Sequence, residues 1–233
     1  MNFSRIVALK GEFEAEGLSR DCVAAEAAFA ARHGLPYLVK IGGCEAKSDI
    51  RFLTQIGVRH VVAPMIESAF AMRKYMQMLP EDAFDHVGVT IETIDAVRRI
   101  DDILDAGVKL SEVTVGRTDL TASFAGTGVD SDETIAMVKT VAKAARARGL
   151  KTTMGGSVGA GTRQRLERDE ELRDSLACLE TRKCVMPVAK FLEEGAISAA
   201  FAIEEALLEM QLAHHGLIAQ AASARIDQIR SRL

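Results

Sequence analysis

Residues 87–119 read VGVTIETIDAVRRIDDILDAGVKLSEVTVGRTD and contain the unit that decides the fold. The stretch begins with a short run rich in β-branched residues, 87–91, and a second run of this kind follows at 112–116. Between them, apolar residues recur at three- and four-residue spacing over 97–104, which predicts one apolar face of a helix, and Gly107 stands where that helix would end. The order strand, helix, strand predicts two parallel strands joined by a helical crossover.

The same alternation continues in both directions from this unit. Further strand-like runs, each next to a helical pattern, are found at 6–9, 37–41, 60–66, 151–154 and 181–186. The alternation predicts an α/β fold of the (β/α)8 TIM-barrel-like class, with seven strands evident and C-terminal helices. Because a complete barrel of this class has eight strands, either one strand is hidden or the barrel is incomplete or closed by the helices. An open doubly wound sheet is the competing fold.

The chain shows no change of composition and no low-complexity linker, so we expect a single catalytic domain over residues 1–233. A helical extension from about residue 196 to 233 carries apolar side chains on more than one side, among them Phe201, Leu208 and Leu212. The apolar side chains of such a helix must be buried against another surface. Either the barrel of the same chain or another protein surface can bury them.

Composition narrows the class of protein. The 233 residues are 48% hydrophobic and 27% charged, which is enough for the core of one barrel. A net charge of −4 argues against a nucleic-acid partner, and four scattered cysteines without a metal-binding spacing indicate a reducing compartment. No apolar run approaches the ~18 residues of a membrane helix, and the N-terminus lacks a secretory pattern. We expect a cytoplasmic protein with no membrane partner.

Acidic residues and glycines follow the predicted strands at their carboxyl ends, where the working groups of a parallel barrel lie. Glu92 and Asp119 follow consecutive strands. Since neighbouring strands lie roughly 4.8 Å apart, both carboxylates can reach one ion. Oxygen ligands favour Mg²⁺ or Mn²⁺, so the pair is a candidate metal site. The alternative is that both acids are solvated loop residues.

The segment Gly116, Arg117, Thr118 and Asp119 is a candidate substrate-binding turn. If a helical turn begins there, its backbone N–H groups can hold a substrate carboxylate. A turn with no binding role is the alternative reading.

Lys40 ends an apolar strand and would direct its ammonium group to the same end of the barrel. It can bind a substrate oxygen, form a Schiff base, or be an ordinary surface lysine. The five histidines lie away from the strand ends that carry the acids. Acid–base chemistry would then fall to Glu12, Glu14, Lys40 or a metal-bound water.

Four segments resemble the HpcH/HpaI aldolase and citrate lyase β-subunit family: LVKI at 38–41, VVAPMIES at 61–68, IET at 91–93 and VGRTDLT at 115–121. The resemblance covers about residues 8 to 160. It implies a barrel that binds pyruvate-like substrates through Mg²⁺ or Mn²⁺, with Glu92 and Asp119 as metal ligands and backbone groups around Thr118 and Asp119 on the substrate carboxylate. It also implies assembly through the C-terminal helices, so we expect a homo-oligomer in which the extension at 196–233 joins copies of the chain; the alternative is that the extension is buried against its own barrel.

The chain departs from this family at two positions. Lys40 stands where the aldolases have an Arg that contacts the substrate oxo group, and Gly11-Glu12-Phe13 stands where a catalytic His follows a Gly-Glu pair. The family also includes enzymes that form carbon–carbon bonds and lyases that act on CoA esters.

The resemblance and the residues together predict a divalent-metal-dependent carbon–carbon lyase, an aldolase acting in either direction. Its substrate would be a small 2-oxo acid such as pyruvate or oxaloacetate, and a metal-stabilised enolate would be the intermediate. Lys40 would neutralise the oxyanion, and Glu12 or Glu14 would orient the acceptor or a water. Two alternatives stay open: a Schiff-base aldolase that uses Lys40, and a non-catalytic carboxylate-binding or assembly subunit.

Overall fold

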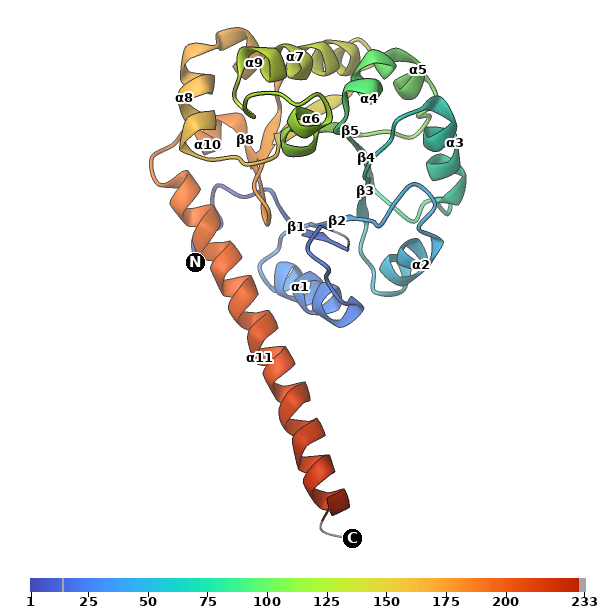
Figure 1. Ribbon diagram of the computed structural model, residues 1–233, viewed down its shortest axis with the longest axis vertical. Helices are drawn as coiled ribbons and strands as arrows, with labels where there is room; N and C mark the ends of the chain where they lie inside the picture. Colours follow the sequence, from blue (N-terminus) through green and yellow to red (C-terminus); the bar gives the residue numbers. More distant parts are fainter. Residues whose placement is uncertain (14, 231–233) are drawn as a thin grey trace.

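The computed structural model describes residues 1–13 and 15–230, without the side chains of 227–229. In the described part of the chain, strands in sequence order close a barrel (Figure 1): β1 (Ala8–Glu12), β2 (Tyr37–Lys40), β3 (His60–Ala63), β4 (His86–Ile91), β5 (Glu112–Gly116), β6 (Lys151–Gly155), β7 (Cys178–Glu180) and β8 (Cys184–Pro187). The barrel confirms the predicted fold class, and its closure excludes the open doubly wound sheet.

Helices surround the barrel (Figure 1): α1 (Arg20–Arg32), α2 (Lys47–Gln55), α3 (Ala69–Met78), α4 (Ile94–Arg98), α5 (Ile100–Asp105), α6 (Arg117–Ser123), α7 (Asp132–Arg146), α8 (Ala160–Arg168), α9 (Glu170–Ser175), α10 (Val188–Phe191) and α11 (Ala196–Arg230). Hydroxyl side chains cap α1, α3, α4 and α7 by accepting a backbone N–H of the first turn: Ser19, Ser68, Thr93 and Ser131. Such caps satisfy N–H groups that the helix itself leaves unpaired, and they set where each helix starts.

The eighth strand, β7, is the one that the sequence pattern does not reveal. β7 runs parallel to β6 but antiparallel to β8, which in turn pairs antiparallel with β1. The predicted strand at 181–186 therefore begins later, at Cys184, and runs against the other strands. Arg182 and Lys183 form the tip of a hairpin where a standard barrel has a crossover helix. The tip lies at the mouth, by which we mean the end of the barrel formed by the carboxyl ends of β1 to β7.

Most of the apolar core lies outside the barrel, between its strands and the surrounding helices. Side chains such as Leu9, Val89 and Met154 point outward into a large cluster shared with the helices. Inside the barrel, a small separate cluster contains Ala8, Leu38, Val62 and Val185. Since side chains alternate along a strand, the residues on the inward face above and below this layer are polar, and they lie at the mouth and at the opposite end, the floor.

Helix α11 leaves the barrel. Its first part packs on α10 and β8, with Ala196, Ala200, Ile203 and Leu207 buried. Farther along it projects from the barrel as a straight rod (Figure 1), and Leu217 is 67% exposed. None of the helices in the described part of the chain combines the length and apolar content that a membrane span requires.

Candidate metal and substrate site at the barrel mouth

A cavity of about 560 Å³ opens at the mouth. Among the described residues its walls carry these ionisable side chains: Lys10, Glu12, Lys40, Glu92, Asp119, Glu180, Arg182 and Glu204. A second cavity, of about 540 Å³, adjoins the first and shares Glu12, Lys40, Glu92 and Asp119 with it. Five carboxylates face three cationic groups in the first cavity, which leaves a formal excess of two negative charges.

Glu92 follows β4 and is buried at the base of both cavities. Its Oε1 accepts the backbone N–H of Met65 at 2.9 Å, and its Oε2 accepts from Nζ of Lys40 at 3.3 Å. Burial raises the pKa of Glu92 above its ordinary value, Lys40 opposes the rise, and the negative charge of Asp119 adds to it. A further cation beside Glu92 would favour its ionised form.

Asp119 lies in the first turn of α6 and lines both cavities together with Glu92. Gly116 leaves room for the Glu92 carboxylate, because a Cβ at this position would lie 2.8 Å from Oε2 of Glu92. The structure therefore brings the two predicted metal ligands to one site. Within the described residues, no three His, Cys, Asp or Glu side chains form a metal-binding group. Two carboxylates fit Mg²⁺ or Mn²⁺, which keep waters and accept substrate oxygens as further ligands.

Lys10 and Glu180 extend the charged wall from β1 and β7. Nζ of Lys10 lies 2.6 Å from Oε1 of Glu12 and 2.6 Å from Oε1 of Glu180. Nζ of Lys40 lies 3.9 Å from the other oxygen of Glu12. Burial disfavours the ionised form of Glu12, but Lys10 and Lys40 together outweigh it, so the pKa of Glu12 lies below its ordinary value. Glu12 is thus a carboxylate at neutral pH and can accept a hydrogen bond from a ligand.

The other predicted acid–base groups differ in their placement. Lys40 lies between Glu12 and Glu92, in contact with both carboxylates. Glu14 lies outside the described residues. None of the five histidines lines either cavity. His60 and His86 instead stack at the floor, with ring centroids 5.2 Å apart.

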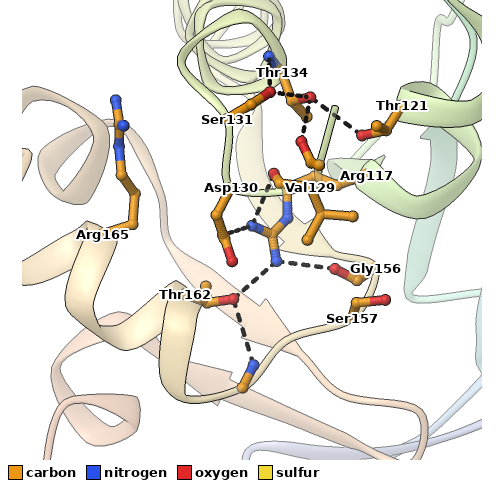
Figure 2. A network of polar contacts seen from close by, with 12 residues as sticks. Arg117, Thr121, Val129, Asp130, Ser131, Thr134, Gly156, Ser157, Thr162 and Arg165 are labelled. Carbon is orange, nitrogen blue, oxygen red and sulfur yellow. Dashed lines mark hydrogen bonds and ion pairs between the residues drawn. The ribbon is translucent and has the colours of Figure 1, made fainter. Parts of the chain in front are cut away.

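Arg117 is fully buried and lines neither cavity. Its guanidinium donates to Gly155 O at the end of β6 (3.0 Å). Figure 2 shows its other acceptors, which come from the loops before α7 and α8 and from α8 itself: Gly156 O (2.9 Å), Thr162 Oγ1 (3.1 Å), Val129 O (3.3 Å) and the carboxylate of Asp130. These contacts use all five N–H groups that a guanidinium carries. The predicted substrate-binding role therefore does not extend to the Arg117 side chain, which ties the loops before α7 and α8 to α6.

Gly156 leaves a cradle of donors beside α6. It has a φ of +81°, and a Cβ here would lie 2.5 Å from the backbone N of Thr118, 2.6 Å from that of Arg117 and 3.0 Å from Oγ1 of Thr118. Oγ1 of Thr118 also lies 3.2 Å from Oγ of Ser157 (Figure 2 shows the Gly156–Ser157 loop). Because Gly156, Ser157 and Thr118 line the mouth cavity, this group of donors can receive a carboxylate.

Sequence reasoning did not place four functional side chains of the mouth: Glu180, Arg182, Phe201 and, also in α11, Glu204. Glu180 and Arg182 reach the cavity through the β7–β8 hairpin, and Phe201 reaches it from α11. A weak signal existed, since the apolar Leu179 precedes the acidic Glu180, as in a strand with a two-residue period. Residues 178–180, however, are too few for this period to identify a strand.

Comparison with known proteins gives the family. The profile of the HpcH/HpaI aldolase/citrate lyase family matches residues 25–164, which is more than half of the chain. No curated protein sequence matches.

Solved structures share the fold. An HpcH/HpaI aldolase from Desulfitobacterium hafniense DCB-2 superposes with a TM-score of 0.59 at 17% identity, covering 70% of this chain and 73% of that one. RipC from Yersinia pestis gives 0.58 at 17% identity, with coverages of 81% and 84%. The citrate synthase SbnG gives 0.62 at 13% identity, with coverages of 88% and 84%. The profile match over residues 25–164 shows that the chain belongs to the HpcH/HpaI aldolase/citrate lyase family.

Proposed function

We propose that this chain is a divalent-metal-dependent carbon–carbon lyase, or catalyses the reverse condensation, on a small 2-oxo acid such as pyruvate or oxaloacetate. Membership of an aldolase and lyase family supports a lyase acting on a small molecule. The proposal of a metal rests on the placement of Glu92 and Asp119 in one cavity whose walls hold an excess of negative charge. A bound Mg²⁺ or Mn²⁺ supplies Lewis acidity beside the carboxylate and oxo oxygens of the substrate.

The protein groups have separate roles in this proposal. The backbone N–H groups of Arg117 and Thr118 hold the substrate carboxylate. In the cleavage direction, the bond between C3 and C4 of a 4-hydroxy-2-oxo acid breaks, and its electron pair moves into the enolate of the 2-oxo acid. Lys40 places its ammonium next to the oxygen that becomes negative. Glu12 accepts the proton of the 4-hydroxyl group as the aldehyde forms.

The variant Asp119→Ala tests the metal site. It removes one of two protein ligands, so we expect Mn²⁺ binding and pyruvate–aldehyde turnover to fall by at least ~10²-fold. Asp102→Ala is the matched control, because Asp102 is an exposed acid in the first turn of α5 and lies outside the cavities. Full turnover in Asp119→Ala would refute the proposal.

A Schiff-base aldolase is the second candidate, and the position of Lys40 inside the mouth is the observation that favours it. Chelation separates the two chemistries. EDTA stops the metal enzyme, whereas borohydride with pyruvate adds a stable mass to Lys40 only if an imine forms. A non-catalytic carboxylate-binding subunit, favoured by Phe13 in place of a His, would bind oxalate or pyruvate tightly and turn over no aldehyde.

We also propose that residues 1–233 form one catalytic domain whose α11 joins copies of the chain. The exposed apolar side chains of this helix beyond the mouth support an interface: Leu208, Leu212, Leu217, Ile218 and Ile226. Apolar surface of this extent on a projecting helix is favourable only when it is covered.

A further inference from the structure

The β7–β8 hairpin holds its tip rigidly at the mouth. Thr181 and Cys184 close the turn, with the N–H of Thr181 donating to Cys184 O at 2.9 Å. Lys183, one of the two tip residues, turns toward the helix layer and is completely buried. Its Nζ lies 2.8 Å from Oε1 of Glu26 in α1 and also contacts the carboxylate of Glu16.

Arg182, the other tip residue, has the opposite environment. It is exposed and lines the mouth cavity. The other cations of this cavity, Lys10 and Lys40, each contact two carboxylates. The Arg182 guanidinium makes no ion pair or hydrogen bond with the described residues, although its charge acts on Glu12. A guanidinium held at a cavity wall with unused donors is suited to bind a carboxylate or phosphate.

The wall beside Arg182 also has an apolar part. Phe201 of α11 lines the same cavity and is 50% exposed. An aliphatic chain can therefore lie against Phe201 while its end reaches the guanidinium. Glu204 lines this wall as well, and its charge opposes an anion there.

We propose that Arg182 binds a second anionic group, a carboxylate or phosphate, at the far end of the substrate. This inference rests on the proposed function, which places the 2-oxo acid end of the substrate at Glu92, Asp119 and the Gly156 cradle. It makes the preferred substrate at least dianionic and makes Arg182 the residue that selects it.

Calorimetric titration of the intact protein with Mn²⁺ present tests the inference. Two 2-oxo acids of equal length are compared: 2-oxoglutarate, which ends in a carboxylate, and 2-oxovalerate, which ends in a methyl group. 2-Oxoadipate and 2-oxohexanoate repeat the comparison one carbon longer. 2-Oxo-4-phosphonobutyrate separates a phosphate-type end from a carboxylate.

The wild-type protein should bind the best anionic-ended acid roughly tenfold or more tightly than its neutral partner. Arg182→Gln should remove this preference and leave the affinity for the neutral acid unchanged within about twofold. Glu204→Gln should increase the preference. Arg51→Gln, an exposed arginine of α2 outside the cavities, should preserve it.

Equal affinity for anionic and neutral partners in the wild-type protein overturns the inference, as does a preference that survives Arg182→Gln. In both cases the head group still binds, so the proposed function stands. If neither oxalate nor any of these acids binds with Mn²⁺ present, the proposed function itself fails, and the inference fails with it.

Discussion

Glu112 lies at the start of β5 on the floor of the barrel, where burial raises its pKa to about 7. The negative charge of Glu180 adds to the rise, and a hydrogen bond from Thr114 opposes it. Nε2 of His86 lies 3.7 Å from Oε2 of Glu112, and burial lowers the pKa of His86 to about 4. Between these two values both groups are neutral, so their contact is not an ion pair near pH 5.5.

We therefore predict that Glu112→Gln is stabilised relative to the wild-type protein, by an amount that depends on pH. Because the pKa of Glu112 is raised in the folded state, its protonated form stabilises the fold. This stabilisation is fully present below about pH 4.5 and is lost as the pH rises through about 7. The variant does not titrate, so its free energy of unfolding relative to wild type should increase by up to ~3 kcal/mol between pH 5 and pH 8. Urea denaturation at both values measures this change. The exposed Glu133→Gln should show no such change, and parallel curves for Glu112→Gln would contradict the raised pKa.

Gly156→Ala tests the cradle for the substrate carboxylate. A side chain at a φ of +81° costs about 1–2 kcal/mol, and this Cβ would also press on the N–H of Thr118 at 2.5 Å. We expect the affinity for oxalate with Mn²⁺ to fall at least ~tenfold while the protein stays folded. Gly128→Ala, which has open space around its Cβ, is the control. Unchanged oxalate affinity would show that the cradle does not bind the substrate carboxylate.

Residue types and spacing were enough to predict that Glu92, Asp119 and Lys40 lie together at the mouth. They could not predict where the Arg117 side chain points. Its direction depends on acceptors in the loops around residues 130 and 156, which are distant in sequence from α6. An arginine in a ligand-binding motif is therefore interpreted as a binding residue until the hydrogen-bond acceptors of its guanidinium are known.

At the scale of elements, the strand–helix units predicted from periodicity are present from β1 to β6, because each has an apolar strand followed by an amphipathic helix. The β7–β8 hairpin was not predictable in the same way. β7 has three residues, and the hairpin replaces the crossover on which the pattern depends. The residues missed at the mouth follow from this one element and from α11.

Lys183→Met tests the anchor of the hairpin. The substitution leaves the carboxylates of Glu16 and Glu26 buried without their cation, so we expect a loss of about 3–5 kcal/mol in the free energy of unfolding. Adding Glu26→Gln should recover part of the loss, because it removes one of the uncompensated charges. Chemical denaturation compares both variants with Lys109→Met, an exposed lysine. A loss no larger than that of Lys109→Met would show that the cluster does not stabilise the hairpin.

At the scale of the whole molecule, α11 is the part whose role depends on a partner. The sequence shows that this helix is apolar on more than one side. It does not show whether the barrel or another copy of the chain buries those side chains. The structure answers half of this question, since one face of the first turns is buried and the projecting part is exposed.

The double variant Leu217→Glu/Ile218→Glu should dissociate the proposed oligomer, because it places charges on exposed apolar positions of the rod. Light scattering coupled to size exclusion should show a larger assembly for wild type and a single chain for the variant. Val108→Glu changes an exposed apolar residue far from α11 and should leave the assembly intact. A wild-type protein that is monomeric at all concentrations would refute the assembly role.

The most direct test of the account is a crystal of the protein soaked with Mn²⁺ and oxalate, measured with X-rays tuned to the manganese absorption edge. If the proposed metal site is present, we expect one anomalous peak in the mouth, within coordination distance of both Glu92 and Asp119, with oxalate bound to the same ion. A mouth without an anomalous peak, or a peak bound by neither carboxylate, would contradict it.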